Sequence, residues 1–209
     1  MPLLGLAVSS ASSMFDPVSF RSALGSFATG VTIVTARDKA GAPVGLTANS
    51  FNSVSLDPPM VLWSLALQSS SLPVFRDATS WAVHVLAADQ QGMSDRFATP
   101  GVDKFAGLDP ADGPEGAPLI EGCAARFGCQ AQFEYEGGDH AIFLGEVTDF
   151  DRREAEPLIY HGGRYGRIMR TPSGANLERE GLAHAEDGVL ILTERGSELL
   201  EALQALAKR

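Results

Sequence analysis

The ten residues from Arg126 to Tyr135 alternate strictly between polar or glycine positions and positions that can be buried. The positions of the second kind are Phe127, Cys129, Ala131, Phe133 and Tyr135. A period of two is typical of a half-buried β-strand, because successive side chains of a strand point to opposite faces of the sheet. Glu136–Asp139 is then predicted to be a turn and His140–Asp149 the returning strand. The pattern predicts an antiparallel hairpin and favours a mainly β fold.

The stretch from Gly45 to Ser71 contains two more predicted strands, and their compositions differ. Leu46–Ser55 is rich in small and polar residues, whereas Met60–Leu67 is almost entirely apolar. The sequence Asp57-Pro58-Pro59 separates them, and consecutive prolines fix φ and donate no backbone hydrogen bonds, so a sharp corner is expected there. Because Met60–Leu67 does not alternate, we expect both of its faces to be buried, one of them by a second subunit.

The small residues of Leu46–Ser55 predict a strand whose backbone is open to a ligand. A flat polycyclic ligand could lie against such a strand and form hydrogen bonds with its N–H and C=O groups. The following Gln68–Ser71 offers hydroxyls and loop amides to an anion. The same composition also fits a Ser- and Thr-rich edge strand followed by an ordinary polar loop, so the residues alone leave both interpretations open.

The other elements follow from caps and periodicity. Asp16 is a good N-cap for a helix to about Ala28, whose apolar residues Phe20, Leu24 and Phe27 are expected to pack on the β core. His84, in an apolar strand, is predicted to be a core or subunit-contact residue rather than a catalyst. The remaining predicted elements are a strand at Val31–Ala36 that turns through Asp38–Gly41, helices at Pro73–Asp77 and Asp89–Phe97, and strands at Trp81–Ala87 and Pro157–Tyr160.

Composition and charge exclude several classes of protein. The 209 residues suit one domain with an appendage, and 44% hydrophobic residues suffice for a buried core. The net charge of −10 argues against nucleic acid or an anionic membrane as a partner, because both would repel the chain. No transmembrane segment is expected. Cys123 and Cys129 match no common zinc spacing, so we expect two free thiols, no metal site and a cytoplasmic location.

Four motifs, taken in this order, carry a resemblance to a known family: Thr29–Thr32, Gly45–Phe51, Ser53–Pro59 and Gly138–His140. Together they resemble the flavin reductase-like family of FMN-binding split barrels, and within it the reductase components of two-component flavin-dependent monooxygenases. The resemblance covers roughly Phe15 to Arg167. It implies an antiparallel, Greek-key split β-barrel with flanking helices at residues 15–169, preceded by a flexible leader at 1–14 and followed by a helical extension at 170–209.

The resemblance also implies a function. A homodimer would transfer hydride from NADH or NADPH to FMN or FAD and supply the reduced flavin to a partner monooxygenase. The alternative is a non-enzymatic FMN-binding or pyridoxamine-phosphate-oxidase-like module, since one fold can host several functions.

The resemblance assigns residues to this function. The flavin phosphate is expected at the serine loop, Ser69–Ser71, where relatives often have a lysine. This loop has no lysine, so a positive charge would have to come from Arg76, Arg96 or Lys104. His140 is expected to dock the nicotinamide, with Tyr160, His161 and Tyr165 as the next candidates. Flavin-binding residues are expected to be Thr47, Ala48, Asn49, Ser50, Ser53, Ser64, Leu65, Ser69, Ser70, Ser71 and Phe97.

The C-terminal extension differs in character from the barrel. Val189–Leu192 is predicted to be a strand, and a helix with Leu199, Leu203 and Leu206 on one stripe follows. The segment resembles the wing and last helix of winged-helix regulators, without their DNA-reading helices. It has five basic and seven acidic residues from Arg170 onward, which does not suit DNA binding. We expect it to pack against the barrel or the other subunit.

Overall fold

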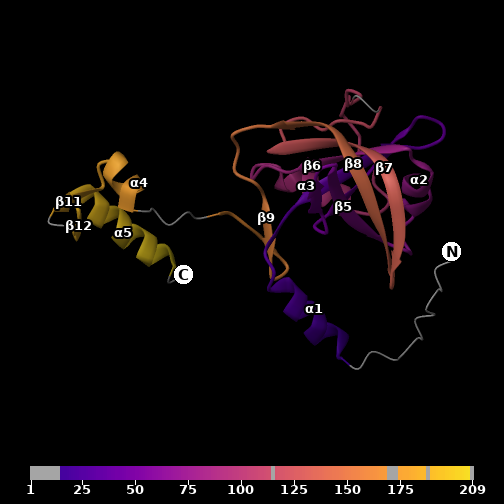
Figure 1. Ribbon diagram of the computed structural model, residues 1–209. Coiled ribbons are helices and arrows are strands. Elements are labelled where there is room, and N and C mark those ends of the chain that lie inside the picture. Colours follow the sequence, from indigo (N-terminus) through magenta and orange to yellow (C-terminus); the bar gives the residue numbers. More distant parts are fainter. Residues whose placement is uncertain (1–14, 114–115, 169–173, 187–188, 208–209) are drawn as a thin grey trace. The chain divides into compact units, whose positions relative to one another are not determined.

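The computed structural model describes residues 15–113, 116–168, 174–186 and 189–207. The chain divides into two compact units, with the division between Ile168 and Met169 (Figure 1). The larger unit is built around a seven-stranded sheet, with the helices α1 (Pro17–Gly25), α2 (Leu72–Asp77) and α3 (Gln91–Ala98). None of the helices described is both long and apolar enough to cross a membrane.

The seven strands follow the order β3-β2-β6-β7-β8-β5-β4, and every neighbouring pair is antiparallel. This arrangement belongs to the antiparallel split-barrel class predicted from the sequence. The bounds are β2 Thr32–Arg37, β3 Pro43–Ala48, β4 Asn52–Leu56, β5 Pro59–Ala66, β6 Ser80–Val85, β7 Ala125–Gly137 and β8 His140–Arg152.

The two edge strands of this sheet, β3 and β4, are consecutive in the sequence. Only residues 49–51 connect them, so the sheet curls until its two edges approach each other. The prediction of one strand over Leu46–Ser55 is therefore wrong: the chain leaves one edge after Ala48 and joins the other at Asn52. The corner at Asp57 and Pro58 is confirmed, because β4 and β5 form an antiparallel hairpin around it.

Two hydrophobic clusters lie on the two faces of the sheet. The inner cluster is rich in aromatic rings: Trp63 stacks on Phe143 and meets Phe75 edge-on, with ring centroids 4.8 Å apart in both pairs. The outer cluster fixes α3 and the segment 105–123 against the sheet, and its buried members include Ile33 and Phe97. This second cluster places α3 beside β3.

The predicted hairpin of β7 and β8 is present, and Gly138 at its tip has a positive φ of 72°. Its outer half extends beyond the core, so Phe133 and Tyr135 are each 53% exposed. The prediction that both faces of β5 are buried is not met within one chain. Val61, Trp63 and Leu65 are buried, whereas the residues between them are only half-buried.

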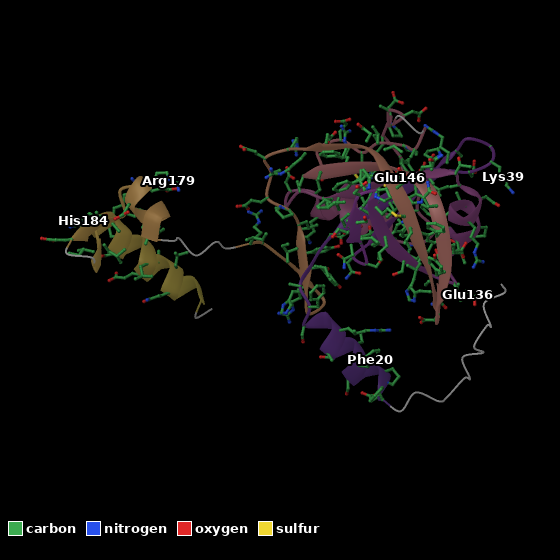
Figure 2. All side chains as sticks on the ribbon, viewed as in Figure 1. Phe20, Lys39, Glu136, Glu146, Arg179 and His184 are labelled. Atoms are coloured by element: carbon green, nitrogen blue, oxygen red, sulfur yellow. The ribbon has the colours of Figure 1, made fainter. Side chains whose placement is uncertain are left out.

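The predicted packing of the first helix on the β core is wrong. Helix α1 begins after its N-cap Asp16, whose side chain accepts a hydrogen bond from the Ser19 N–H, but none of the helix residues is buried. Figure 2 shows Phe20 on this helix, which lies apart from the sheet, so no described part of the larger unit covers its apolar face. The predicted strand Pro157–Tyr160 is present with shifted bounds as β9 (Ile159–His161), and it joins β1 (Thr29–Gly30) and β10 (Arg164–Gly166) in a separate small sheet.

The smaller unit contains α4 (Gly174–Arg179), β11 (Ala183–Glu186), β12 (Val189–Leu192) and α5 (Glu194–Ala207). The strand and the long helix were predicted, whereas α4 and β11 were not. Thr193 caps α5, because its hydroxyl accepts the Gly196 N–H at 3.2 Å. On α5, Leu199 and Leu200 are 40% and 45% exposed, and the packing of this unit against the barrel or another subunit stays a prediction.

Candidate active site

The free side of β3 provides backbone groups for a ligand. β3 pairs with β2 alone, so the groups on its other side lie outside the sheet's hydrogen-bond ladder. On that side the Gly45 carbonyl accepts a hydrogen bond from Lys104 Nζ at 3.1 Å. The small side chains of the strand leave this edge accessible, which agrees with the open backbone expected from its composition.

One end of β3 borders a cavity of about 220 Å³, which we call the tyrosine pocket. It is lined by Val31, Thr47, Ala48, Asn49, Ser94, Ala98, Tyr160 and Tyr165. Three of the predicted flavin-binding residues, Thr47, Ala48 and Asn49, thus line the same cavity as the two tyrosines.

Hydrogen bonds fix the polar wall of the tyrosine pocket. The Thr47 hydroxyl donates to the Ser94 carbonyl at 2.6 Å, and the Ser94 and Tyr165 hydroxyls lie 2.9 Å apart. Tyr165 also donates to Asp95 Oδ1 at 2.8 Å. Chiefly through burial, the pKa of Tyr165 is raised above its ordinary value, so its hydroxyl stays protonated at neutral pH.

The other end of β3 borders a cavity of about 300 Å³, the serine pocket. It is lined by Ser70 and Ser71, by Gly45 of β3, and by the segment 100–105, which includes Lys104. Ser69 lies beside it, and its hydroxyl accepts the Ser71 N–H at 3.3 Å. Burial lowers the pKa of the half-buried Lys104 below its ordinary value.

Gly45 lets the segment 100–105 approach the strand. A Cβ on Gly45 would lie 2.7 Å from Cε1 of Phe97, so the phenyl ring packs directly on the backbone. Phe97 is fully buried and meets Phe105 edge-on, with ring centroids 5.1 Å apart. Phe97, one of the predicted flavin contacts, therefore presents no exposed surface in this chain and supports the pocket walls from behind.

Four other predicted residues line neither pocket. The Ser50 hydroxyl bonds to the backbone of Ser64 on β5. Leu65 is buried in the inner cluster, and Ser53 is exposed on β4 opposite Val61. The structure brings together the residues of β3 and the serine loop, but places Ser53 and Leu65 apart from them.

His140 is the first residue of β8 and lies opposite Ala66, at the end of β5 where the serine loop begins. Its Nδ1 lies 2.7 Å from Asp139 Oδ1, and 44% of its side chain is exposed. The hydrogen bond with His140 lowers the pKa of the Asp139 carboxyl. The Leu67 N–H donates to the Asp139 carbonyl at 2.9 Å, which holds this turn beside the serine loop.

His84 lies in the core, as predicted. It is fully buried, its Nδ1 lies 3.1 Å from the Ile33 carbonyl, and its Nε2 has no partner among the described residues. Desolvation lowers the pKa of His84 to about 4, so the imidazole is neutral at physiological pH.

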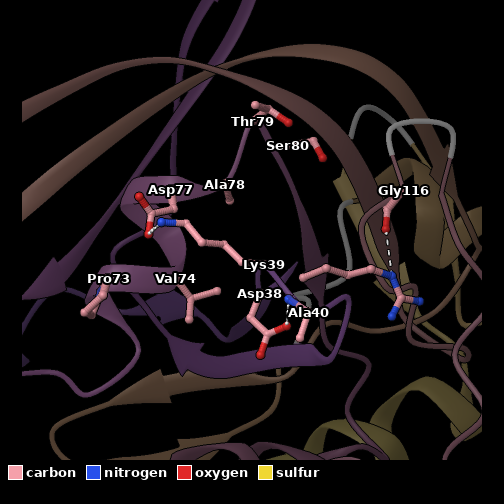
Figure 3. Close-up of a pocket in the computed structure, with 11 residues that line it drawn as sticks. Asp38, Lys39, Ala40, Pro73, Val74, Asp77, Ala78, Thr79, Ser80 and Gly116 are labelled. Carbon is pink, nitrogen blue, oxygen red and sulfur yellow. Dashed lines mark hydrogen bonds and ion pairs between the residues drawn. The ribbon is translucent and has the colours of Figure 1, made fainter.

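A larger cavity, of about 600 Å³, lies between the β2–β3 turn and α2 (Figure 3). Its charged groups are already paired within the chain. Lys39 Nζ lies 3.1 Å from Asp77 Oδ2, and Arg37 bonds to Asp112 and to the Gly41 and Gly116 carbonyls. Size alone therefore does not make this cavity the stronger candidate for a charged ligand.

Comparison with known proteins finds similarity to flavin reductases. Residues 24–169 match the family model described as a flavin reductase like domain. An NADH-dependent FMN reductase of Agrobacterium fabrum is 51% identical over 152 residues, which cover 73% of this chain and 86% of that protein. The reductase subunit of a flavin-dependent monooxygenase of Rhodococcus jostii is 39% identical over 159 residues, covering 76% and 81% of the two chains.

A solved structure of a flavin oxidoreductase is also similar to this chain. The NADH:FAD oxidoreductase of Streptomyces globisporus, in complex with NAD and FAD fragments, has a TM-score of 0.70 and 42% sequence identity. The match covers 74% of this chain and 93% of that one.

Proposed function

Because the chain belongs to the flavin reductase-like family, we propose that it is an NAD(P)H-dependent flavin reductase, which transfers hydride to FMN or FAD and supplies reduced flavin to a partner monooxygenase. The relatives above support each part of this function: two are NADH-dependent flavin oxidoreductases and one is the reductase subunit of a monooxygenase. The alternative of a non-enzymatic flavin-binding module has less support, since these relatives are reductases.

The observation that carries the binding mode is the free edge of β3 with a cavity at each end. Gly45 and Ala48 are three residues apart on this strand, so about 10 Å separate the two cavities along it. We place the flavin ring at the tyrosine pocket, against Thr47, Ala48 and Asn49, and its phosphate at the serine pocket. A neutral tyrosine wall at one end and a cation at the other fit these two parts of a flavin.

The chemistry places modest demands on the side chains. Hydride passes from the nicotinamide C4 to the flavin N5, so holding the two rings in contact matters more than proton transfer. The bonds from Thr47 to Ser94 and from Ser94 to Tyr165 keep the proposed ring site rigid. His140, half-exposed at the start of β8, is proposed to dock the nicotinamide.

We also propose a cytoplasmic homodimer whose barrel domain spans residues 15–169, with 170–209 as an extension. The apolar residues Phe20 and Leu24 of α1 and Phe133 of β7 are more than half exposed in the single chain. Several large apolar side chains exposed on one chain are typical of a protein–protein interface, and a two-fold dimer would cover them. Cys123 and Cys129 are free, buried thiols, which suits a reducing compartment.

Steady-state oxidation of NADH with FMN, FAD and riboflavin in turn tests this function. We expect oxidation that depends on added flavin, and a purified protein with little colour, because flavin is a diffusing substrate. A protein that retains flavin tightly and oxidises no NADH would support the binding module. A protein that neither binds flavin nor oxidises NADH would contradict both functions.

A further inference from the structure

A cavity larger than both pockets at β3 has no part in the function proposed above. It has a volume of about 600 Å³, lies between the β2–β3 turn and α2, and is called the turn cavity below (Figure 3). Its lining comes from residues 37–40, from Pro73 and Val74 of α2, from residues 77–80 and from Gly116. The volume lies in the range of pockets that bind small organic ligands.

The turn cavity adjoins the serine pocket along two segments. Arg37 lines the turn cavity, and its cross-strand partner Pro43 lines the serine pocket, so their Cα atoms are about 5 Å apart. In the second segment, Ser71 lines the serine pocket and Pro73 lines the turn cavity two residues later. A ligand whose phosphate lies in the serine pocket can therefore continue into the turn cavity.

The charges of the turn cavity cancel one another. The cations in its lining are Arg37 and Lys39, and the carboxylates are Asp38 and Asp77. Lys39 pairs with Asp77 across the cavity, and Asp38 accepts the Ala40 N–H at 2.9 Å. An ionic group would meet no uncompensated charge here, so the cavity suits the uncharged part of a ligand.

The turn cavity also offers apolar surface and a free hydroxyl. Pro73 and Val74 provide apolar side chains on which a flat ring can pack. The Thr79 hydroxyl forms no hydrogen bond with any other described residue, whereas its backbone carbonyl accepts an N–H of β7 at 2.9 Å. The side chains of Lys39 and Asp77 are 82% and 50% exposed, so their ion pair contributes little to stability and can open around a ligand.

We propose that the turn cavity binds the adenosine of FAD and so makes this chain prefer FAD to FMN. This inference rests on the flavin reductase function proposed above, which places the flavin phosphate in the adjoining serine pocket. Adenosine is uncharged at neutral pH and is linked to that phosphate through one further phosphate. The purine packs on Val74, a ring nitrogen accepts from the Thr79 hydroxyl, and a ribose hydroxyl donates to Asp77.

Calorimetric titration with FAD and with FMN tests the proposal without relying on turnover. The parent protein should bind FAD more tightly than FMN. Val74→Trp fills the turn cavity and should raise the dissociation constant of FAD at least about tenfold, with that of FMN unchanged. Thr79→Val removes only the hydroxyl and should weaken FAD binding about fivefold, again without an effect on FMN. The control Gln132→Trp, exposed on β7 and lining neither cavity, should change neither constant.

Unchanged FMN binding shows in the same titrations that each variant is folded. A parent protein that binds FAD no more tightly than FMN would overturn the proposal and leave the reductase function intact. Equal weakening of FAD and FMN in both variants, or unchanged FAD binding, would do the same. A parent protein that binds neither flavin would instead overturn the proposed function and this inference together.

NADH also carries an adenosine, so its apparent affinity is measured with FMN as the acceptor. We expect Val74→Trp to leave this affinity unchanged. Weaker use of NADH together with unchanged FAD binding would assign the turn cavity to the hydride donor and overturn the proposal.

Discussion

The Ser50 hydroxyl makes two hydrogen bonds to the backbone of Ser64, accepting from its N–H and donating to its carbonyl, each at 3.0 Å. Ser50 lies between β3 and β4, where the chain crosses from one edge of the sheet to the other. A side chain thus takes the place of a strand partner at this point of β5. The residue holds the open side of the barrel together, beside the wall formed by Asn49.

Ser50→Ala should destabilise the fold, because it leaves the half-buried amide and carbonyl of Ser64 without these bonds. We expect a loss of about 1–3 kcal/mol in the free energy of unfolding. Urea denaturation measures it. Ser53→Ala, at an exposed hydroxyl on β4, is the control and should change stability by less than about 0.5 kcal/mol. Equal effects of the two substitutions would show that the paired bonds are not important.

His84 should make the fold sensitive to acid. The unfolded chain binds a proton near the ordinary histidine pKa of about 6.5, whereas the folded chain does so only near 4. Stability is therefore unaffected at higher pH and falls as the pH drops from about 6.5 to 4. Between pH 7 and pH 5 the parent should lose about 2 kcal/mol more than His84→Gln, which has no imidazole to protonate. Parallel pH profiles of urea unfolding would contradict this.

His140→Ala should impair the use of NAD(P)H while leaving flavin binding nearly intact. Misorientation of the nicotinamide lowers the hydride-transfer rate as well as the apparent donor affinity, by about ten- to a hundredfold in total. Asp139→Asn keeps an oxygen that can bond to the imidazole, so its effect should be smaller. If His140→Ala reduces flavin at the parent rate with parent donor affinity, the residue belongs only to the turn, and Tyr160 or Tyr165 is the next candidate.

The apolar face of α1 should be part of a subunit interface. Sedimentation of the parent protein at micromolar concentration should show a dimer, and the double substitution Phe20→Glu and Leu24→Glu should shift it toward monomer. Ala40→Glu, at the exposed tip of the β2–β3 turn, is the control and should leave the dimer intact. A parent protein that sediments as a stable monomer would refute this interface.

Local patterns predicted much of the fold. The alternation ending at Tyr135 specified the β7–β8 hairpin, and Pro58 with Pro59 specified the corner before β5, because both signals act between neighbouring residues. What the sequence did not reveal depends on contacts between distant segments. The position of Lys104 at the serine pocket depends on the packing of the segment 100–105 against Gly45, and the bond from Ser94 to Tyr165 needs β10 to lie against α3.

The position of α1 shows another limit of sequence patterns. The apolar spacing of Phe20 and Leu24 correctly indicates a helix with one face to be covered, and the Asp16 cap fixes its start. Periodicity says that a face is apolar, but not which surface covers it. The prediction that the barrel of the same chain does so failed for that reason.

Anaerobic rapid mixing of NADH with the protein and an equimolar amount of FMN tests the central claim most directly. We expect rapid loss of the visible absorbance of oxidised flavin, at a rate that rises with NADH concentration and saturates, because the donor must bind before hydride transfer. The same mixture without protein should bleach far more slowly. Bleaching no faster with the protein than without it would contradict the assignment of this chain as a flavin reductase.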